Sequence, residues 1–528
     1  MCNITIRVST ARRRPWLRPN RPASCRFLEK DRALVTQTGL STRTGMWQNA
    51  LYRACQESLR QRRLAQRGLG GTEEIQDGVS IMPEPHFLDT LRSDAAAILA
   101  ACLEAADPEM AVRRFLEIRG DRLVVDRDVS LDLSNCGRIV VVGAGKASAA
   151  MARAVEDLLG DRISGGVVSV KYDHGVPLEK IEVVEAGHPL PDESGECAAR
   201  KIIDLLKPLN EKDLVISCIS GGGSALLPAV PEGITLREKQ ELTQQLLSVG
   251  ADIHEMNAVR KHLSQTKGGN LMRFAYPAFV VNLMLSDVVG DDPDTIASGP
   301  FVPDRSTFGD VSDILRKYSL ADRVSERVRR RIDRGAGSGA EETPKQGDPI
   351  FERVRNIIVG SNIRSLEAGK EKAAELGYHA VILSSTMEGD TTGAALFHAA
   401  VGREIRSTRN PVHPPACVLT GGETTVVMKG RGKGGRNQHF ALSLVRKAAE
   451  IPDSLFVSAG TDGTDGPTDA AGAQVDTDTL ARAEALGLNP DTFLANNDAY
   501  HFFEPLGDLI ITGPTRTNVM DVRIILVG

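Results

Sequence analysis

The sequence predicts an α/β protein with a doubly wound parallel sheet and a second α/β domain, and it places the active site in the cleft between them. From residue 85 onward, short apolar runs typical of buried strands alternate with longer segments whose apolar residues recur at helical spacing. Glycine is abundant, at 50 residues, and aromatic residues make up only 4%. This mixture is typical of α/β proteins, in which glycine-containing turns join strands to helices.

Two α/β segments are separated by a stretch rich in glycine, proline and serine at residues 334–350, which predicts a linker or long loop. We therefore expect a first domain at 85–333 and a second at 351–528. The strands expected in the first domain are 138–142, 166–172, 181–186, 214–219 and 278–286. Those expected in the second are 356–359, 379–384, 417–420, 424–428, 455–458, 508–511 and 522–527.

The leader, residues 1–84, has a different composition. Its first 70 residues hold fourteen arginines and three acidic residues, a mixture that resembles a mitochondrial transit peptide. The alternatives are a disordered basic tail, or translated upstream sequence ahead of a start at Met46 or Met82. We expect a cytoplasmic protein, or a mitochondrial one if the leader is a genuine transit peptide.

Charge and cysteine content exclude several classes of partner. The net charge of −5 gives no sign of a nucleic-acid surface, and no apolar run is long enough to span a bilayer. None of the eight cysteines forms a zinc-ligand spacing, so we interpret them as reduced thiols. We expect a small-molecule substrate rather than nucleic acid or membrane. The sequence allows a homodimer but does not determine the oligomeric state.

The central feature is an apolar strand at 214–219 that leads directly into a turn with three consecutive glycines. These glycines expose backbone N–H groups and tolerate positive φ, and the serine after them stands where a helix N-cap would be. Bare amides at a helix N-terminus bind anions, most often phosphate. The alternative is a tight strand-to-helix turn without a ligand. The predicted phosphate-binding residues are Ser220, Gly221, Gly222, Gly223 and Ser224.

Ligands of open α/β sheets bind beyond the carboxyl ends of the strands, so charged residues at those ends are candidates. Lys146 lies in a glycine turn, GAGKAS, that follows one strand and opens a helix. This turn has neither the acid of a dinucleotide fold at its expected place nor the pattern of a P-loop, which leaves Lys146 as a point charge for phosphate or carboxylate. Asp287 follows another strand and suits a general base or a metal ligand. A surface lysine and a turn aspartate are the alternatives.

Two further candidates come from the second domain. The basic loop GRGKGGRNQ enters a helix, and its Arg436 suits a bidentate phosphate clamp beside the bare backbone of Gly434 and Gly435. A flexible surface loop is the alternative. The segment GTDGTDGPTD follows a strand, and its Asp462, nearest the strand end, suits a hard cation or the hydroxyls of a polyol.

One more polar segment lies in the first domain, over residues 254–270, with the sequence HEMNAVRKHLSQTKGGN. It combines Asn257, Arg260, Lys261, Ser264 and Lys267. Because Lys267 precedes two glycines, a helix C-terminus explains it as well as a function does.

Taken together, two glycine-rich anion sites, a basic loop and strand-end carboxylates predict phosphoryl transfer. That chemistry needs positioning, charge neutralisation and Mg²⁺ rather than a protein nucleophile. The motifs SCISGGGSALL, IHEMNAVRKHLSQTKGG, LSDVVGDDPDTIASGP, GGETTVVMKGRGKGGRNQ, SAGTDGTDGPTDAAGA and TGPTRTNVMD together resemble the glycerate 2-kinases that carry a MOFRL C-terminal domain. The resemblance runs from about residue 85 to 528.

The resemblance implies phosphorylation of D-glycerate to 2-phosphoglycerate with ATP and Mg²⁺. It also implies a Rossmann-like first domain and a distinct α/β second domain. The family's cleft residues match Lys146, Asp287, Arg436 and Asp462, which the strand-end argument also selects.

Each cleft residue has an expected role. Asp287 would accept or orient the proton of the 2-hydroxyl, while Lys146 and Arg436 would balance charge on the carboxylate or the moving phosphoryl group. Asp462 would hold Mg²⁺ or the substrate, and Asp287 is the second candidate metal ligand.

Two other functions stay open. A hydroxypyruvate reductase using NAD(P)H is supported by the GAGKAS turn and weakened by the missing acid. A non-catalytic sensor of a sugar acid or a nucleotide would bind its ligand without turnover.

Overall fold

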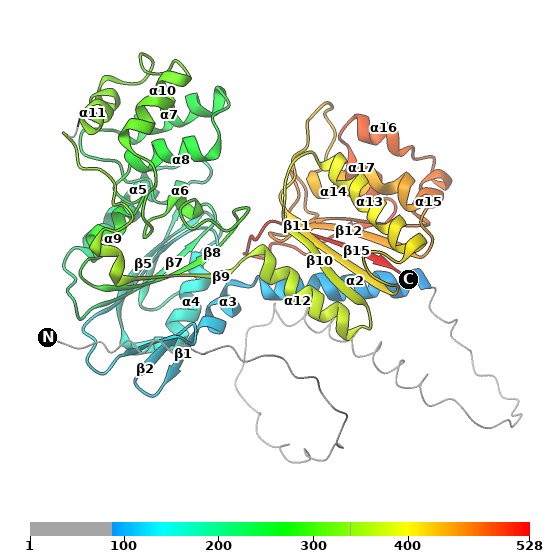
Figure 1. The fold of residues 1–528 in the computed structure, drawn as a ribbon, viewed down its shortest axis with the longest axis horizontal. Coiled ribbons are helices and arrows are strands. Elements are labelled where there is room, and N and C mark those ends of the chain that lie inside the picture. The colour runs from blue at the N-terminus through cyan, green and yellow to red at the C-terminus, as the bar shows by residue number, and fades with distance from the viewer. Residues whose placement is uncertain (1–86, 338) are drawn as a thin grey trace, which may run out of the picture. The chain divides into compact units, whose positions relative to one another are not determined.

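The structure is a computed structural model that describes residues 87–337 and 339–528. The leader predicted for residues 1–84 lies outside the described residues. Two six-stranded sheets organise the described part of the chain (Figure 1). They confirm the predicted α/β class.

The first sheet is parallel throughout, with the strand order β6-β5-β4-β7-β8-β9. Counted in chain order, the strands lie as 3-2-1-4-5-6, which is the order of a doubly wound sheet. The winding reverses between β4 and β7, and ligands of such sheets bind beyond the carboxyl ends of the strands at this switch point. The strands are β4 (Ile139–Ala144), β5 (Ile163–Lys171), β6 (Ile181–Ala186), β7 (Leu214–Ser220), β8 (Phe279–Leu285) and β9 (Val354–Gly360).

Helices cover both faces of this sheet, which explains why its strands are nearly continuous apolar runs. Val141 of β4 packs in one core with helix α4 (Ser148–Leu159), whereas its neighbour Val140 packs in another with α5 (Glu193–Leu206). The first core also holds α3 (Pro108–Phe115) and an antiparallel sheet that was not predicted. That small sheet consists of β1 (Leu116–Arg119), β2 (Arg122–Val125) and β3 (Val129–Asp132).

A helical subdomain is inserted beside the carboxyl ends of β7 and β8. Its own core contains Leu242, Val259 and Leu315. Its helices are α7 (Leu236–Ser248), α8 (Ile253–His262), α10 (Phe308–Lys317) and α11 (Glu326–Ala336), and the short helices α6 (Gly223–Leu226) and α9 (Asn270–Ala275) flank it in the chain.

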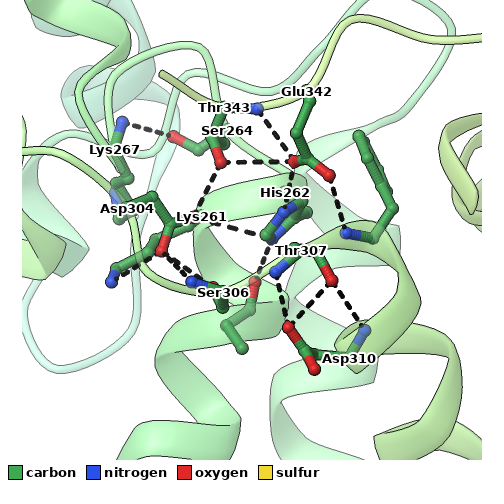
Figure 2. Close-up of polar contacts among 12 residues, drawn as sticks. Lys261, His262, Ser264, Lys267, Asp304, Ser306, Thr307, Asp310, Glu342 and Thr343 are labelled. Carbon is green, nitrogen blue, oxygen red and sulfur yellow. Dashed lines mark hydrogen bonds and ion pairs between the residues drawn. The ribbon is translucent and has the colours of Figure 1, made fainter. Parts of the chain in front are cut away.

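The predicted linker is a loop, but part of it is fixed to the helical subdomain. Glu342 accepts a hydrogen bond from His262 Nε2 at 2.8 Å, and Thr343 Oγ1 donates to Asp304 Oδ2 at 2.9 Å (Figure 2). Helix α11 also extends to Ala336, inside the predicted linker. The segment is therefore anchored, because it supplies partners for buried polar groups.

The second sheet has the order β10-β11-β15-β12-β13-β14, with β10 and β11 parallel and the remaining pairs antiparallel. Its strands are β10 (His379–Met387), β11 (Ala416–Gly422), β12 (Ser454–Gly460), β13 (Gly472–Asp476), β14 (Leu509–Ile510) and β15 (Asp521–Val527). The prediction of a strand at 424–428 is wrong, since that segment forms only an isolated bridge between Thr425 and Asp390.

Helices also cover both faces of the second sheet. One core joins it to α13 (Thr391–Thr408), α14 (Arg436–Ala448), α15 (Thr479–Ala485) and α17 (Ala499–Phe503). The opposite core joins it to α2 (Phe87–Ala105) and α12 (Asn362–Glu375). Helix α16 (Pro490–Ala495) lies in the chain between α15 and α17.

Two elements pack outside the domain ranges predicted for them. Strand β9 pairs with β8 and completes the first sheet, although it falls inside the predicted second domain. Helix α2 packs on the second sheet, although it falls inside the predicted first domain. All described residues fall in one unit by their internal contacts. Among them, no helix combines the length and the apolar character needed to cross a membrane.

Arg92 provides a test of the position of α2. Its guanidinium donates to Asp476 at 2.8 Å and to Asp508 at 2.7 Å, and both carboxylates are almost fully buried. Arg92→Met should lower the free energy of unfolding by about 2 kcal/mol in urea titrations, because each buried carboxylate loses a charged hydrogen bond and keeps only Arg482 as a cationic neighbour among the described residues. Arg316→Met, which removes an exposed pair, is the control and should cause no measurable change. An unchanged Arg92 variant would contradict this account.

Candidate active site

The carboxyl ends of the parallel strands bring polar groups from five strands to one edge of the first sheet. Lys146 follows β4, Lys171 ends β5, and His188 follows β6. The glycine turn follows β7, and Asp287 follows β8. These groups are close together, because a side chain at Gly222 would meet the His188 ring at 3.0 Å and Lys146 Cγ at 3.5 Å.

The two glycine turns of the switch point are bonded to each other. The Lys146 amide donates to the Gly221 carbonyl at 2.9 Å, and the Ala147 amide donates to Ser220 Oγ at 3.0 Å. Gly145 has φ of +140°, and a side chain there would lie 2.1 Å from Ser220 Oγ. The backbone that carries Lys146 is thus fixed by the neighbouring turn.

Each of the three consecutive glycines is required, two because of a close contact and one because of its positive φ. A Cβ on Gly221 would lie 1.9 Å from Asp287 Oδ2, and one on Gly223 would lie 2.8 Å from both the Ala144 carbonyl and Ala297 Cβ. Gly222 has φ of +83°, and it caps the four-residue helix α6. The prediction of Ser224 as N-cap is therefore wrong. Ser224 lies inside the helix, where its hydroxyl is 3.1 Å from that of Ser298.

Three amides of this turn have no acceptor among residues 87–337 and 339–528. Within the described part of the chain, no hydrogen bond is donated by the backbone N–H groups of Gly221, Gly222 and Gly223. Gly221 and Gly223 are buried. Because buried amides are nearly always satisfied, these three groups are suited to an external acceptor such as phosphate or water.

Asp287 is a poorly solvated carboxyl. Burial raises its pKa to about 6, and Glu423 adds to this rise, while Lys146 and its own amide act in the opposite direction. A carboxyl with this pKa is ionised at neutral pH, yet it is basic enough to take a proton from a hydroxyl in a transition state.

His188 was missed by the sequence analysis. Burial, together with the charges of Lys146 and Lys171, lowers its pKa to about 4. The ring is therefore neutral at neutral pH and available as a hydrogen-bond donor. It follows the third strand of the sheet, so the strand-end argument could have selected it.

In the second sheet, Arg436 opens α14 and is held by two carboxylates. Its Nε and Nη2 donate to Asp521 at 2.8 and 3.0 Å, and its Nη1 donates to Glu423 at 2.7 Å. Three of its five N–H groups are therefore in use. Asp521 occupies the bidentate face that we expected a phosphate to take, so Arg436 has two N–H groups left for a ligand.

The N-terminus of α14 is capped by Asp465, which accepts from the amides of Asn437 and Gln438 at 3.0 and 2.8 Å. Gly435 is required here, because a side chain would lie 2.3 Å from Asp465 Oδ1. A cavity of about 410 Å³ lies beside this end of the helix. Its lining includes Glu423, Thr424, Gly434, Gly435, Arg436 and Asp465.

The basic loop before α14 is held by the segment Asn496–Asp498, whose acceptors take amides of residues 429–433 at 2.7 to 3.2 Å. Those asparagines therefore serve as turn caps. Asp462 is only partly buried, and its Oδ1 accepts from the Thr464 amide at 3.1 Å.

Glu423 interacts electrostatically with candidate residues of both the first and the second sheet. Burial raises the pKa of this carboxyl, the cations of Arg436 and Lys146 lower it, and the carboxylates of Asp521 and Asp462 raise it. Asp287 also interacts with Glu423 and Lys146. Glu423 was missed in the sequence, although it directly follows β11 and meets the strand-end criterion.

Comparisons with known proteins identify the family of this chain. The family model described as a domain of unknown function, DUF4147, matches residues 94–333, and the MOFRL family model matches residues 416–521. The glycerate 2-kinase of Pyrococcus horikoshii is 40% identical over 438 residues, which cover 83% of this chain and 97% of the relative. The chain belongs to the glycerate 2-kinase family.

The similar proteins also include a relative with another name and a protein of known structure. A putative hydroxypyruvate reductase of Agrobacterium vitis is 42% identical and covers 82% of this chain and 93% of the relative. The crystal structure of glycerate kinase from Thermotoga maritima has a TM-score of 0.76 at 40% identity, and it covers 83% of this chain and 100% of that chain.

Gly221→Ala tests the contact between the glycine turn and Asp287. The added methyl group would overlap the carboxylate, so Asp287 must move. We expect turnover with ATP and D-glycerate to fall about 100-fold, the size of effect seen when a reacting group is displaced by about 1 Å. Gly393→Ala in α13 is the matched control, because its methyl group would contact only Asp390 Oδ2, at 3.6 Å. Normal turnover in Gly221→Ala would show that this contact does not position Asp287.

The pKa of Asp287 predicts a pH dependence of stability. It is about 6 in the fold against an ordinary value of 3.8, so the folded protein keeps a proton that the unfolded chain releases. The stability from this carboxyl is complete below pH 3.8 and is lost as the pH rises through about 6. The melting temperature of the protein relative to Asp287→Asn should therefore fall between pH 4 and about 6 and stay constant above that range. If the difference in melting temperature between the protein and Asp287→Asn does not change with pH, the Asp287 carboxyl is solvated.

Proposed function

We propose that this chain transfers the γ-phosphoryl group of ATP to the 2-hydroxyl of D-glycerate. Membership of the glycerate 2-kinase family supports the reaction. The observation that carries the proposal is the position of Asp287, which packs against Gly221 in the turn whose amides are unsatisfied and interacts with Lys146. A base, a cation and an anion-binding backbone are the components that phosphoryl transfer requires.

In the proposed reaction, the 2-hydroxyl oxygen of glycerate forms a bond to the γ-phosphorus. The bond from that phosphorus to the bridging oxygen breaks, and ADP leaves. Asp287 accepts the hydroxyl proton, for which its raised pKa and its poorly solvated position are suited.

The negative charges of substrate and phosphate require balancing groups. Lys146 lies beside the proposed base and interacts with both Asp287 and Glu423, so it is suited to the moving phosphoryl group or to the substrate carboxylate. Arg436 keeps two free N–H groups and orients Glu423. The amides of residues 221–223 would bind phosphate oxygens.

Mg²⁺ is the metal that this chemistry uses, and the local donors are carboxylate oxygens, which it prefers. Among the described residues, no cluster of three metal-ligating side chains is present. This fits Mg²⁺, which is commonly bound by one or two carboxylates together with the phosphates of the substrate. We assign it to Asp462, with Glu423 and Asp287 as neighbouring carboxylates. When bound, the ion neutralises charge on the phosphates.

The alternative function, hydroxypyruvate reduction with NAD(P)H, has less support. In dinucleotide folds an acid near the end of the second strand binds the ribose hydroxyls. Here that strand, β5, ends in Lys171, and Asp173 beyond it is exposed with φ of +65°. Release of ADP with D-glycerate, compared with the change of NADH absorbance with hydroxypyruvate, separates the two functions.

Asp287→Asn tests the proposed base. Turnover measured by coupled ADP release should fall 10²- to 10⁴-fold, about the contribution of general-base catalysis. In the unmodified protein, kcat/KM should decrease as the pH falls through about 6, because protonated Asp287 cannot accept the hydroxyl proton. The variant should lose this acid limb.

The control for this experiment is Asp292→Asn, in the same loop. Asp292 is paired with the exposed Arg305, so its variant should keep both the turnover and the pH profile. Turnover of Asp287→Asn within a few-fold of the unmodified protein would remove Asp287 from the reaction.

A further inference from the structure

Three cations lie close together in the helical subdomain, and none is paired with a carboxylate of the described residues. Lys239 is on α7, Arg260 is on α8, and Lys267 lies in the loop after α8. Lys267 interacts with the charges of both other residues, and Lys239 with that of Arg260. The exposed fraction is 6% for Lys239 and 1% for Lys267. Among the described residues, Glu196 is the one acid that interacts with the cluster, and it is the weakest influence on Lys239.

Most side-chain N–H groups of these cations donate no hydrogen bond within the described residues. Lys239 Nζ has no partner in the described part of the chain, and Lys267 Nζ donates to one backbone carbonyl, that of Leu227, at 2.6 Å. The guanidinium of Arg260 has neither a hydrogen bond nor an ion pair with any described residue. By contrast Lys261, next to Arg260, contacts Asp294 at 2.5 Å. It also contacts Asp304, at 3.1 Å (Figure 2).

This contrast indicates a missing anion. Burying an ammonium group without a partner costs several kcal/mol, and folded proteins nearly always pair such groups. The protein pairs Lys261 with two carboxylates, but leaves its neighbours unpaired. Burial and the charge of Arg260 lower the pKa of Lys239 to about 7, as expected for a cation that lacks its counter-charge.

The three-cation cluster is continuous with the glycine turn at the switch point. Leu227, the acceptor for Lys267, directly follows α6, which begins in that turn. Ser298 Oγ lies 3.1 Å from Ser224 Oγ and donates to Asn257 Oδ1 at 3.1 Å. Asn257 lies one helical turn before Arg260 on the same face of α8.

The backbone around Ser298 supports a functional role for this connection. Ala297 and Ser298 have φ of +51° and +60°, values that non-glycine residues rarely adopt. Such strain tends to occur at binding and catalytic sites, where surrounding contacts fix it. Here it fixes Ser298 between the turn and α8.

We propose that Lys239, Arg260 and Lys267 bind the polyphosphate of the nucleotide co-substrate, next to the amides of residues 221–223. The inference rests on the proposed kinase function, and it deepens it by naming the residues that bind the nucleotide. Three cations match the several charges of a di- or triphosphate, whereas the single carboxylate of glycerate would leave most of them unpaired. Arg260 is partly exposed and would bind the most solvent-accessible phosphate.

Lys239→Met tests the proposal, because it keeps the length of the side chain and removes the charge. The KM for ATP should rise about 10- to 100-fold, the expected effect of losing one charged hydrogen bond, while the KM for D-glycerate stays unchanged. Binding of inorganic tripolyphosphate, measured by calorimetry, should weaken by the same factor. The melting temperature of the ligand-free variant should rise, because an unpaired buried charge is removed.

The matched control is Arg237→Met on the same helix, which removes an exposed cation paired with Glu241 and should leave all these quantities unchanged. Arg260→Met gives the same test at a partly exposed position, so the proposal stays decidable if the Lys239 variant does not fold. Unchanged ATP KM and unchanged tripolyphosphate affinity in these variants would overturn the inference.

The two proposals fail in different ways. If the unmodified protein releases no ADP with D-glycerate, the kinase function is wrong. Tripolyphosphate binding that disappears in Lys239→Met would then still establish the anion site. If the unmodified protein phosphorylates glycerate, but the cluster variants keep their ATP KM, the kinase function stands and the assignment of the cluster fails.

Discussion

The close approach of the Asp287 carboxylate to the backbone of Gly221 is the constraint on which the candidate site depends. Strands β7 and β8 are neighbours in a parallel sheet, so the turn after one must lie beside the residue that follows the other. Only a glycine leaves room for a carboxylate at this distance. The same glycine accepts a hydrogen bond from the backbone of Lys146, so one residue positions both the proposed base and its nearest cation.

Burial shifts the pKa values of groups at the first sheet and in the helical subdomain in directions that suit chemistry better than stability. It raises the pKa of Asp287 and lowers those of His188 and Lys239, and each shift records the cost of keeping a charged group away from water. Elsewhere, as at Arg92 or Lys261, the chain pairs its buried charges. Among the described residues, Lys239 has no such partner, and a ligand could supply it.

The first sheet could be predicted because its strands are covered on both faces, which produces uninterrupted apolar runs followed by glycine turns. Lys146 and Asp287 were selected as candidates by the same argument, because strand ends are visible in the sequence. Which sheet a strand joins was not predictable, since β9 and α2 are placed by contacts with distant segments. The prediction of Ser224 as a helix N-cap was wrong, because α6 is too short to behave as an ordinary helix.

The position of α2 has a consequence for biosynthesis. Arg92 and its acceptor Asp508 are separated by 416 residues. Helix α2 therefore leaves the ribosome long before the strands of the second sheet that it covers. Domains that emerge early tend to fold first during translation, and the parallel sheet is complete once β9 has been made. Until α12 and strands β11, β12 and β15 have been made, the apolar face of α2 lacks native partners. A nascent chain of this protein would thus expose the apolar face of α2 until α12 has emerged.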